Sequence, residues 1–388
     1  MSKKGNPFLN FIWLDKKRRA KNISFLLSVV LVLFATGVGY ANSLFEMLTT
    51  GEDLSTTIVT GVPVVDGGDE KLQIDNVNPD EDEDIDDEEM DKVISGSVRE
   101  FVYNWYHNDI EPMRSDYVIN LLLIGLDSRT GLQYGGRSDT LILLSLNTMT
   151  KKINMTSFFR DTYTNIESGG SNSYNKINAS YAKGGADCLI ETLERDFKID
   201  IDYYVTVDFA TFEDIIDELG GLTVTVQEYE AAYIRKTEKI SMPSGTNVTL
   251  NGKQALLFSR IRKCDSDSDV SRTRRQRSVI MSLINSIKGA SLSELMTMLN
   301  TLLPYVKTNL TVKEIQSYAT QALGYGWLSY EIVQTTISER ELFRTGYVGN
   351  SSVVFIEFPK AAQKIQNAIY GTTNIVINEG DQTLFSLI

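Results

Sequence analysis

The sequence predicts an α/β domain in which helices cover both faces of a mixed central sheet, giving a three-layer α/β/α sandwich. Several short apolar runs show no alternation of polar and apolar positions, which is typical of strands buried on both faces. Segments with apolar residues at helical spacing lie between these runs. Because strands that alternate with helices pack as layers around one sheet, this order favours the sandwich.

Strands and helices follow one another in the order that this architecture requires. We expect strands at residues 118–124, 141–146, 153–159, 202–207, 222–226, 331–337 and 353–358. We expect helices at residues 186–197, 210–219, 251–258, 279–287 and 360–370, with a largely helical stretch between 287 and 323. If the second strand runs antiparallel to the first and third, its start meets their ends at one edge of the sheet.

Local signals mark where several helices begin. Asp208 is the expected N-cap of the helix that follows it. Thr311 and Glu314 have the spacing of a capping box. Pro359 suits the first turn of the last helix, where its missing N–H costs nothing. The segment 227–250 shows no clear period, and we expect it to be irregular.

The N-terminal region predicts a membrane anchor. Residues 23–40 carry no charge, which is close to the minimum length for crossing a bilayer, and the following residues can extend the span. Basic residues precede it and place the N-terminus in the cytoplasm. A cleaved signal peptide is the alternative, but no clear small-x-small site follows. The expected parts are a basic cytoplasmic segment (1–22), a transmembrane anchor (23–45), an acidic extracytoplasmic linker leading into the domain (46–116), a catalytic core (117–290) and a C-terminal extension of helices and strands that completes the domain (291–388).

The composition excludes several kinds of site and mechanism. The formal charge of the 388 residues is -13, but Asp66–Asp91 carries most of the excess acid, so the rest of the chain is balanced and can bind an anion. Two cysteines exclude a disulfide framework and a four-cysteine zinc site. The single histidine, His107, precedes the core and argues against a Ser-His-Asp mechanism there. Whether Cys188 and Cys264 pair with each other stays open, because sequence gives no distance between them.

The stretch Ser259–Arg277 is the densest basic segment. It holds six arginines and Lys263, with three aspartates between two basic groups, and apolar helical segments flank it. A helix-loop-helix would bring Arg260 and Arg262 towards Arg272 and Arg275. Guanidinium groups present forks of donors that suit the oxygens of a pyrophosphate. A solvated charge run on a helix is the alternative.

Further polar residues stand at strand ends. Asp127 follows the first strand, Arg137 and Asp139 precede the second, and Arg160 follows the third. Ligand sites of open α/β sheets form at such ends. Two carboxylates beside arginines suit a phosphate with Mg²⁺, which takes oxygen ligands.

A series of motifs resembles the LytR-CpsA-Psr (LCP) family. In chain order they are G-L-D-S-R, G-R-S-D-T, F-F-R-D-T, N-K-I-N-A-S-Y, D-Y-Y-V-T-V-D-F, E-L-G-G-L-T-V-T-V, L-N-G-K-Q-A-L, R-I-R-K-C-D-S-D and R-T-R-R-Q-R. The resemblance covers about residues 117–290. It implies a Mg²⁺-dependent, membrane-anchored bacterial enzyme that moves a glycopolymer, such as teichoic acid or capsule polysaccharide, from a polyprenyl-pyrophosphate carrier to a peptidoglycan acceptor. It also implies an apolar tunnel for the prenyl chain.

Site residues carry over by position in these motifs. Asp127 and Asp139 match the Mg²⁺-associated aspartates. The implied pyrophosphate contacts are Arg137, Arg160, Arg260, Arg262, Arg272, Gln276 and, less directly, Arg275. Asp161 either orients Arg160 or acts as a base. Asn178 is also placed with the pyrophosphate contacts, where it either caps a helix or orients the site.

Other charged and aromatic residues near these motifs are not expected to take part in the site. We expect Arg274 and Arg277 to be solvated or to face the membrane or wall, and Tyr203, Tyr204 and Phe209 to be core residues. Two other functions remain: an envelope regulator that binds a polyprenyl phosphate without turning it over, and a polyprenyl-pyrophosphate hydrolase. Nothing in the sequence indicates nucleic-acid binding.

Overall fold

The computed structural model describes residues 96–127, 136–218, 220–262, 264–265, 268–287 and 306–388. Within these ranges no helix is both long and apolar enough to cross a bilayer. The predicted anchor (23–45), the basic segment before it and residues 46–95 of the predicted linker lie outside the described residues.

A six-stranded mixed sheet forms the centre of the fold, in the order β10-β3-β2-β1-β6-β9. β2 pairs antiparallel with both β1 and β3, as predicted, whereas β6 and β10 join the sheet as parallel strands. The strands are β1 (Val118–Leu126), β2 (Ser138–Asn147), β3 (Lys152–Ser157), β6 (Tyr203–Asp208), β9 (Lys307–Thr308) and β10 (Glu331–Thr335). Their continuous apolar stretches are buried, because helices cover both faces.

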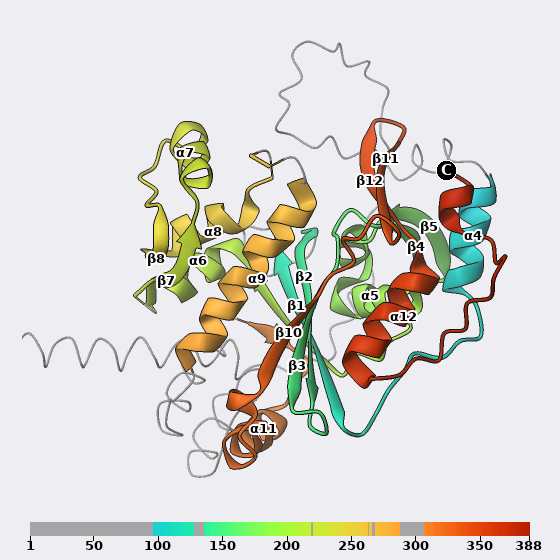
Figure 1. The fold of residues 1–388 in the computed structure, drawn as a ribbon, viewed down its shortest axis with the longest axis horizontal. Coiled ribbons are helices and arrows are strands. Elements are labelled where there is room, and N and C mark those ends of the chain that lie inside the picture. The colour runs from blue at the N-terminus through green and yellow to red at the C-terminus, as the bar shows by residue number, and fades with distance from the viewer. Residues whose placement is uncertain (1–95, 128–135, 219, 263, 266–267, 288–305) are drawn as a thin grey trace, which may run out of the picture.

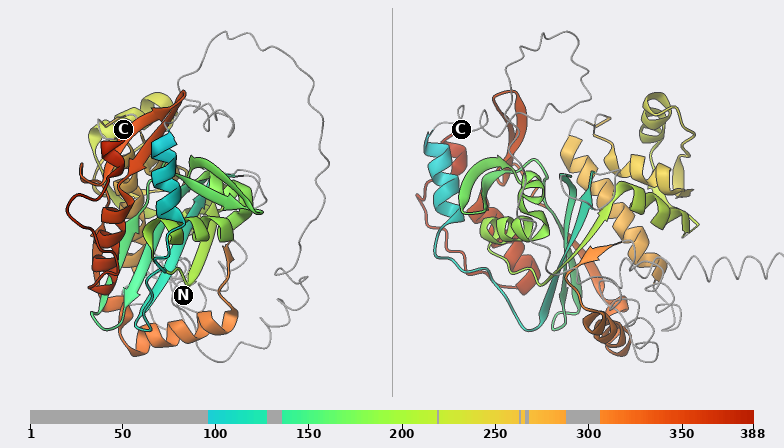
Figure 2. Two further views of the ribbon diagram at one scale, coloured as in Figure 1. Left: turned by 90° about the vertical axis from the view of Figure 1, so that its right-hand side faces the viewer. Right: turned by 180° about the vertical axis from the view of Figure 1, so that it is seen from behind.

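Helices lie on either side of this sheet, and a separate hydrophobic cluster fills each space between (Figures 1 and 2). One side carries α6 (Phe209–Glu218), α8 (Gly252–Arg260), α9 (Ser268–Ile287) and α11 (Val312–Gly324). The other side carries α4 (Gly96–Tyr106), α5 (Ala179–Phe197) and α12 (Phe358–Tyr370). The predicted sandwich is therefore the observed arrangement of the described residues.

The predicted caps of these helices are present. The Asp208 Oδ1 accepts a hydrogen bond from the backbone N–H of Thr211 at 2.8 Å. Thr311 and Glu314 form the expected reciprocal capping box. Pro359 lies in the first turn of α12.

The prediction of an irregular segment at 227–250 is wrong. It contains α7 (Glu228–Thr237) and β8 (Gly245–Leu250), which pairs antiparallel with β7 (Leu222–Val226). α7 begins at a capping box formed by Gln227 and Glu230. β8 is polar and largely exposed, so it lacks the apolar signal of the central strands.

Two further hairpins lie outside the central sheet. β4 (Tyr163–Ser168) pairs with β5 (Ser171–Lys176), and β11 (Phe343–Val348) pairs with β12 (Ser351–Ile356). The second hairpin contacts the first through an isolated bridge between Thr162 and Val354. The C-terminal part of the chain is thereby joined to the segment that follows β3.

Candidate active site

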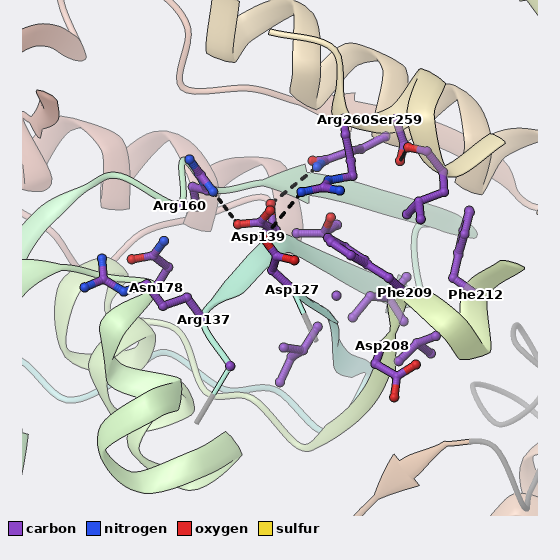
Figure 3. A pocket seen from close by; sticks show the side chains of 18 of the residues that line it. Asp127, Arg137, Asp139, Arg160, Asn178, Asp208, Phe209, Phe212, Ser259 and Arg260 are labelled. Carbon is purple, nitrogen blue, oxygen red and sulfur yellow. Dashed lines mark hydrogen bonds and ion pairs between the residues drawn. The ribbon is translucent and has the colours of Figure 1, made fainter. Parts of the chain in front are cut away.

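A cavity of about 560 Å³ opens where β1 ends and β2 begins, between the sheet and the helices α6, α8 and α9. Its mouth is polar and is lined by six basic side chains and by Asp127, Asp139 and Asp161, whereas the fourth acidic lining residue, Asp208, lies on the side of Phe209 and Phe212 (Figure 3). Its inner part is lined by apolar side chains of strands and helices: Leu123, Ile124, Val205, Val207, Phe209, Phe212, Ile215, Leu256, Val279, Ile280 and Leu283. The cavity therefore offers a charged region and an apolar region to one ligand.

The two predicted metal aspartates both line the mouth, and each has an arginine partner (Figure 3). Arg160 forms an ion pair with Asp139, and the Arg260 guanidinium lies 3.4 Å from the Asp127 carboxylate. The side chain of Asp139 is 12% exposed and that of Asp127 is 45% exposed. Asp127 is thus the more accessible of the two carboxylates.

The end of β1 is shaped by a break in strand pairing. The register between β1 and β2 shifts between Gly125 and Leu126, directly before Asp127. A Cβ at Gly125 would come within 2.9 Å of the Thr140 Cβ, so only glycine lets the two strands approach this closely here. Such irregularities change the direction of side chains at strand ends, and this one lies directly before Asp127.

Asp161 is the centre of the cationic part of the mouth. Its side chain is buried, and its carboxylate lies 2.9 Å from Arg262, 3.3 Å from Arg160 and 3.6 Å from Lys176. Burial alone would raise the pKa of Asp161, but the charges of these three cations and of Arg272 outweigh it and lower the pKa to about 2. A carboxylate with so low a pKa is a weak base, which favours the role of orienting arginines over that of a base.

Four other predicted residues also line the cavity: Arg137, Asn178, Arg272 and Gln276. The Gln276 Nε2 donates to the backbone oxygen of Asp139 at 3.3 Å. The backbone oxygen of Arg137 accepts from the N–H of Asp127 at 3.1 Å, which joins the two motifs. Asn178 precedes α5, but its side chain makes no capping hydrogen bond.

Arg275 does not reach the cavity, contrary to the prediction. Its side chain is 1% exposed and pairs with Glu230 of α7 at 2.8 Å and with Asp265. It also donates to the backbone oxygen of Ile261 at 3.0 Å. Arg275 therefore ties the segment between α8 and α9 to α7 and has no donor directed at a ligand in the cavity.

Arg277 is buried, so the prediction of a solvated side chain is wrong for it. Its guanidinium donates to Gln334 of β10 at 2.9 Å and to Ser157 of β3 at 3.1 Å. Burial and the nearby charge of Arg274 lower its pKa to about 10. Arg274 itself is 55% exposed, as predicted.

Cys188 and Cys264 are both free thiols, which rules out the disulfide considered from the sequence. The Cys188 thiol donates to the backbone oxygen of Glu167 at 3.4 Å, and the Cys264 thiol contacts Asp265 at 3.3 Å. The connection that a disulfide would have given to this loop is made by Arg275 instead.

Lys176 is a site residue that the sequence reasoning missed. It is 6% exposed, lines the cavity and contacts Asp161. Its signal was present, because it stands two positions before Asn178 in the N-K-I-N-A-S-Y motif. Phe209 is buried as predicted, but it also lines the cavity, and the Arg260 guanidinium lies 4.2 Å from its ring centre.

Metal ligands are few in this site. Among the described residues, no group of three or more His, Cys, Asp and Glu side chains could hold a metal ion. A cation at the mouth would therefore rely on Asp127 and Asp139 together with oxygens from a ligand and water, which is the usual coordination of Mg²⁺.

Comparisons with known proteins identify the family and the fold. The LytR_cpsA_psr family model matches residues 72–370. The polyisoprenyl-teichoic acid–peptidoglycan teichoic acid transferase TagU of Bacillus licheniformis is 39% identical over 199 residues, which make up 50% of this chain and 61% of that protein, less than two thirds of its length. The crystal structure of B. subtilis TagV superposes with a TM-score of 0.54 at 29% identity, covering 67% of this chain and 100% of that chain. TagT bound to LIIa-WTA superposes with a TM-score of 0.53 at 26% identity, covering 66% of this chain and 91% of that chain. Because the family model covers most of its length, the chain belongs to the LytR-CpsA-Psr family.

Proposed function

We propose that the protein transfers a teichoic-acid-type glycopolymer from a polyprenyl-pyrophosphate carrier to peptidoglycan. One observation carries this proposal: a single cavity joins a basic mouth to an apolar interior. A lipid pyrophosphate has the same two parts, an anionic head and a hydrocarbon chain. The name of the relative TagU and the LIIa-WTA bound to TagT support the same substrate class.

The reaction is a phosphoryl transfer. A hydroxyl oxygen of peptidoglycan attacks the phosphorus that carries the glycopolymer and forms a new phosphodiester bond. The bond from that phosphorus to the bridging oxygen breaks, polyprenyl phosphate leaves with both bonding electrons, and the hydroxyl proton passes to a base. Such reactions depend mainly on positioning and on neutralising charge.

The basic mouth supplies that neutralisation. Arg160, Arg262 and Lys176 surround Asp161, which holds them in place while remaining ionised. Arg260 lies across Asp127 and the Phe209 ring, on the side of the apolar lining. We place the pyrophosphate between these two groups of cations, with the prenyl chain directed towards α6 and α9.

Magnesium is part of the proposal. Asp127 and Asp139 are the side chains that would hold it, and phosphate oxygens of the lipid would complete its coordination. Bound there, the ion would neutralise charge on the phosphates. We expect chelation with EDTA to abolish transfer and added Mg²⁺ to restore it, whereas transfer that persists in EDTA would remove the ion from the proposal.

We further propose that residues 23–45 anchor the chain in the cytoplasmic membrane with the catalytic domain outside. The supporting observation is the uncharged stretch after the basic N-terminus. Protease added to intact protoplasts should then digest the domain. Protection of the domain in sealed protoplasts would contradict this arrangement.

The test of function uses the full-length chain in detergent with an octaprenyl-pyrophosphate-linked oligosaccharide, purified peptidoglycan and Mg²⁺. We expect transfer by the wild type and a loss of at least about 100-fold in Asp127→Ala and Arg262→Ala. Arg274→Ala is the matched control, because Arg274 lies in the same stretch but outside the cavity, and it should keep wild-type activity.

The products distinguish the three candidate functions. Polymer attached to peptidoglycan supports the transferase. Released oligosaccharide phosphate without attachment would indicate a hydrolase. Saturable lipid binding with neither product would indicate a regulator, and wild-type rates in the two folded cavity variants would refute the assigned site.

A further inference from the structure

Asn178 has a buried amide side chain next to the two carboxylates of the site. It is 2% exposed, its Oδ1 is buried, and no group among the described residues hydrogen-bonds to that oxygen. It stands at the N-cap position of α5, yet its side chain accepts no capping hydrogen bond from the helix. Its backbone is held firmly, because its N–H donates to Arg160 at 3.1 Å and its carbonyl oxygen accepts from Ser138. An unsatisfied buried amide is costly, so this side chain needs a partner that the described residues do not give.

The cavity is where that partner can lie. Asn178 is one of its lining residues. Figure 3 shows Asn178 on one side of the two carboxylates, while Phe209 and Phe212 lie on the other. The elements agree with this view, because α5 belongs to one helical layer and α6 to the opposite layer. A ligand whose prenyl chain lies against α6 therefore presents its other end towards Asn178.

The chemistry of the amide decides what that other end is. A pyrophosphate diester has only acceptor oxygens, so it cannot satisfy the Oδ1 of Asn178. A sugar hydroxyl is both a donor and an acceptor, so it can donate to Oδ1 and accept from Nδ2 at the same time. The sequence motif alone placed Asn178 with the pyrophosphate contacts, but its unsatisfied oxygen fits a hydroxyl better.

We propose that Asn178 forms a sugar-hydroxyl subsite at the polar end of the cavity, on the same side as Arg137 and Arg160. This rests on the proposed function, because it places a lipid pyrophosphate in the same cavity. The hydroxyl belongs either to the first sugar of the donor or to the acceptor glycan. Both have the same chemistry, and the two arms of the experiment below separate them.

The experiment compares the full-length wild type in detergent with Asn178→Ala and with Asn178→Leu, which keeps a similar volume without polar atoms. We expect the affinity for octaprenyl pyrophosphate without a sugar to stay within about twofold of wild type. If the donor sugar is bound, the affinity for octaprenyl pyrophosphate linked to N-acetylglucosamine falls about tenfold, the effect of one lost buried hydrogen bond. If the acceptor is bound, KM for peptidoglycan strands rises about tenfold instead.

Thermal stability separates this role from a structural one. Asn178 makes no cap, so both variants should unfold at or above the wild-type Tm. Asn251 is the matched control, because its side chain does cap α8, accepting from the Gln254 N–H at 2.9 Å. Asn251→Ala should lower the Tm. A similar fall in Asn178→Ala would assign Asn178 a structural role and overturn the subsite.

Two binding outcomes also overturn the proposal. If neither sugar-dependent arm changes, no sugar hydroxyl is bound at Asn178. If the sugar-free lipid weakens as much as the sugar-linked one, Asn178 contacts the pyrophosphate. A wild type that transfers no polymer would refute the proposed function instead. The comparison of the two lipids would then still decide the donor arm, and direct binding of peptidoglycan strands to wild type and Asn178→Ala would decide the acceptor arm.

Discussion

Replacing Arg275 with methionine should destabilise the protein and weaken lipid binding, although Arg275 does not line the cavity. The guanidinium joins three segments: Glu230 of α7, the Ile261 carbonyl after α8, and Asp265 of the loop. The side chains are 1% exposed for Arg275, 4% for Glu230 and 10% for Asp265. Methionine fills a similar volume but leaves the buried Glu230 carboxylate without its cation, and leaves Asp265 only the exposed Arg274 at 3.8 Å.

The expected loss follows from that burial. Removing one partner of a buried ion pair costs about 3–5 kcal/mol, because the remaining charge is neither paired nor hydrated. In a domain of this size the Tm should fall by roughly 10 °C. Affinity for octaprenyl pyrophosphate should fall as well, because Ile261 lies between Arg260 and Arg262 in the chain, and both line the cavity.

Thermal unfolding of the full-length chain and a lipid-binding titration measure the two effects. Arg274→Met is the matched control, because this neighbouring arginine is 55% exposed and should change stability by less than about 0.5 kcal/mol. Adding Glu230→Gln to Arg275→Met should recover part of the loss, since it removes one uncompensated charge. A single Arg275→Met variant that unfolds within about 1 kcal/mol of wild type would refute the network.

Three further predictions concern titration and redox state. The pKa of Asp161 is lowered to about 2, so its ionised carboxylate should contribute roughly 2 kcal/mol to the free energy of unfolding above pH 4, and this contribution is lost as the pH falls towards 2. Denaturant unfolding of Asp161→Asn should therefore show a smaller loss of stability between pH 4 and pH 2 than wild type. Burial raises the pKa of Asp196 well above its usual range, so the folded state favours the protonated carboxyl, and the free energy of unfolding falls as the pH rises. Asp196→Asn should be more stable than wild type at alkaline pH, and equal stability there would contradict this. Because Cys188 and Cys264 are free, intact-mass measurement should find two alkylated thiols without reductant, and a reductant should leave the Tm unchanged.

The centre of the sheet could be predicted because β1 and β2 contain continuous apolar runs that are buried. The edge strand β9 could not, because it has only two polar residues and lies in the stretch 287–323 that was expected to be largely helical. β8 and β11 could not, because their side chains are mostly polar or exposed and neither lies in the buried sheet. α7 was missed for a similar reason, because it lacks a strong apolar pattern. It begins at a capping box, and it is held in place by the ion pair between Glu230 and Arg275 of α9.

Part of the site was predictable for a related reason. Asp127, Asp139 and Arg160 stand beside strand ends, so locating the strands located them as well. The arginines of α9 were harder to separate. Arg272, Arg275, Gln276 and Arg277 are all less than 8% exposed, so burial does not distinguish those that face the cavity from those that pack against other elements. Only the positions of α7, β3 and β10 decide their partners.

The bond between the Val354 N–H and the Asp161 carbonyl oxygen, at 2.8 Å, has a consequence for biosynthesis. The segment that carries Arg160 and Asp161 receives this support only after Val354 has left the ribosome, late in translation. β10 also comes from this late region and covers the outer edge of β3. A nascent or truncated chain that ends before residue 331 would expose that edge to pairing with other chains, so we expect such fragments to aggregate rather than to form a weakened enzyme.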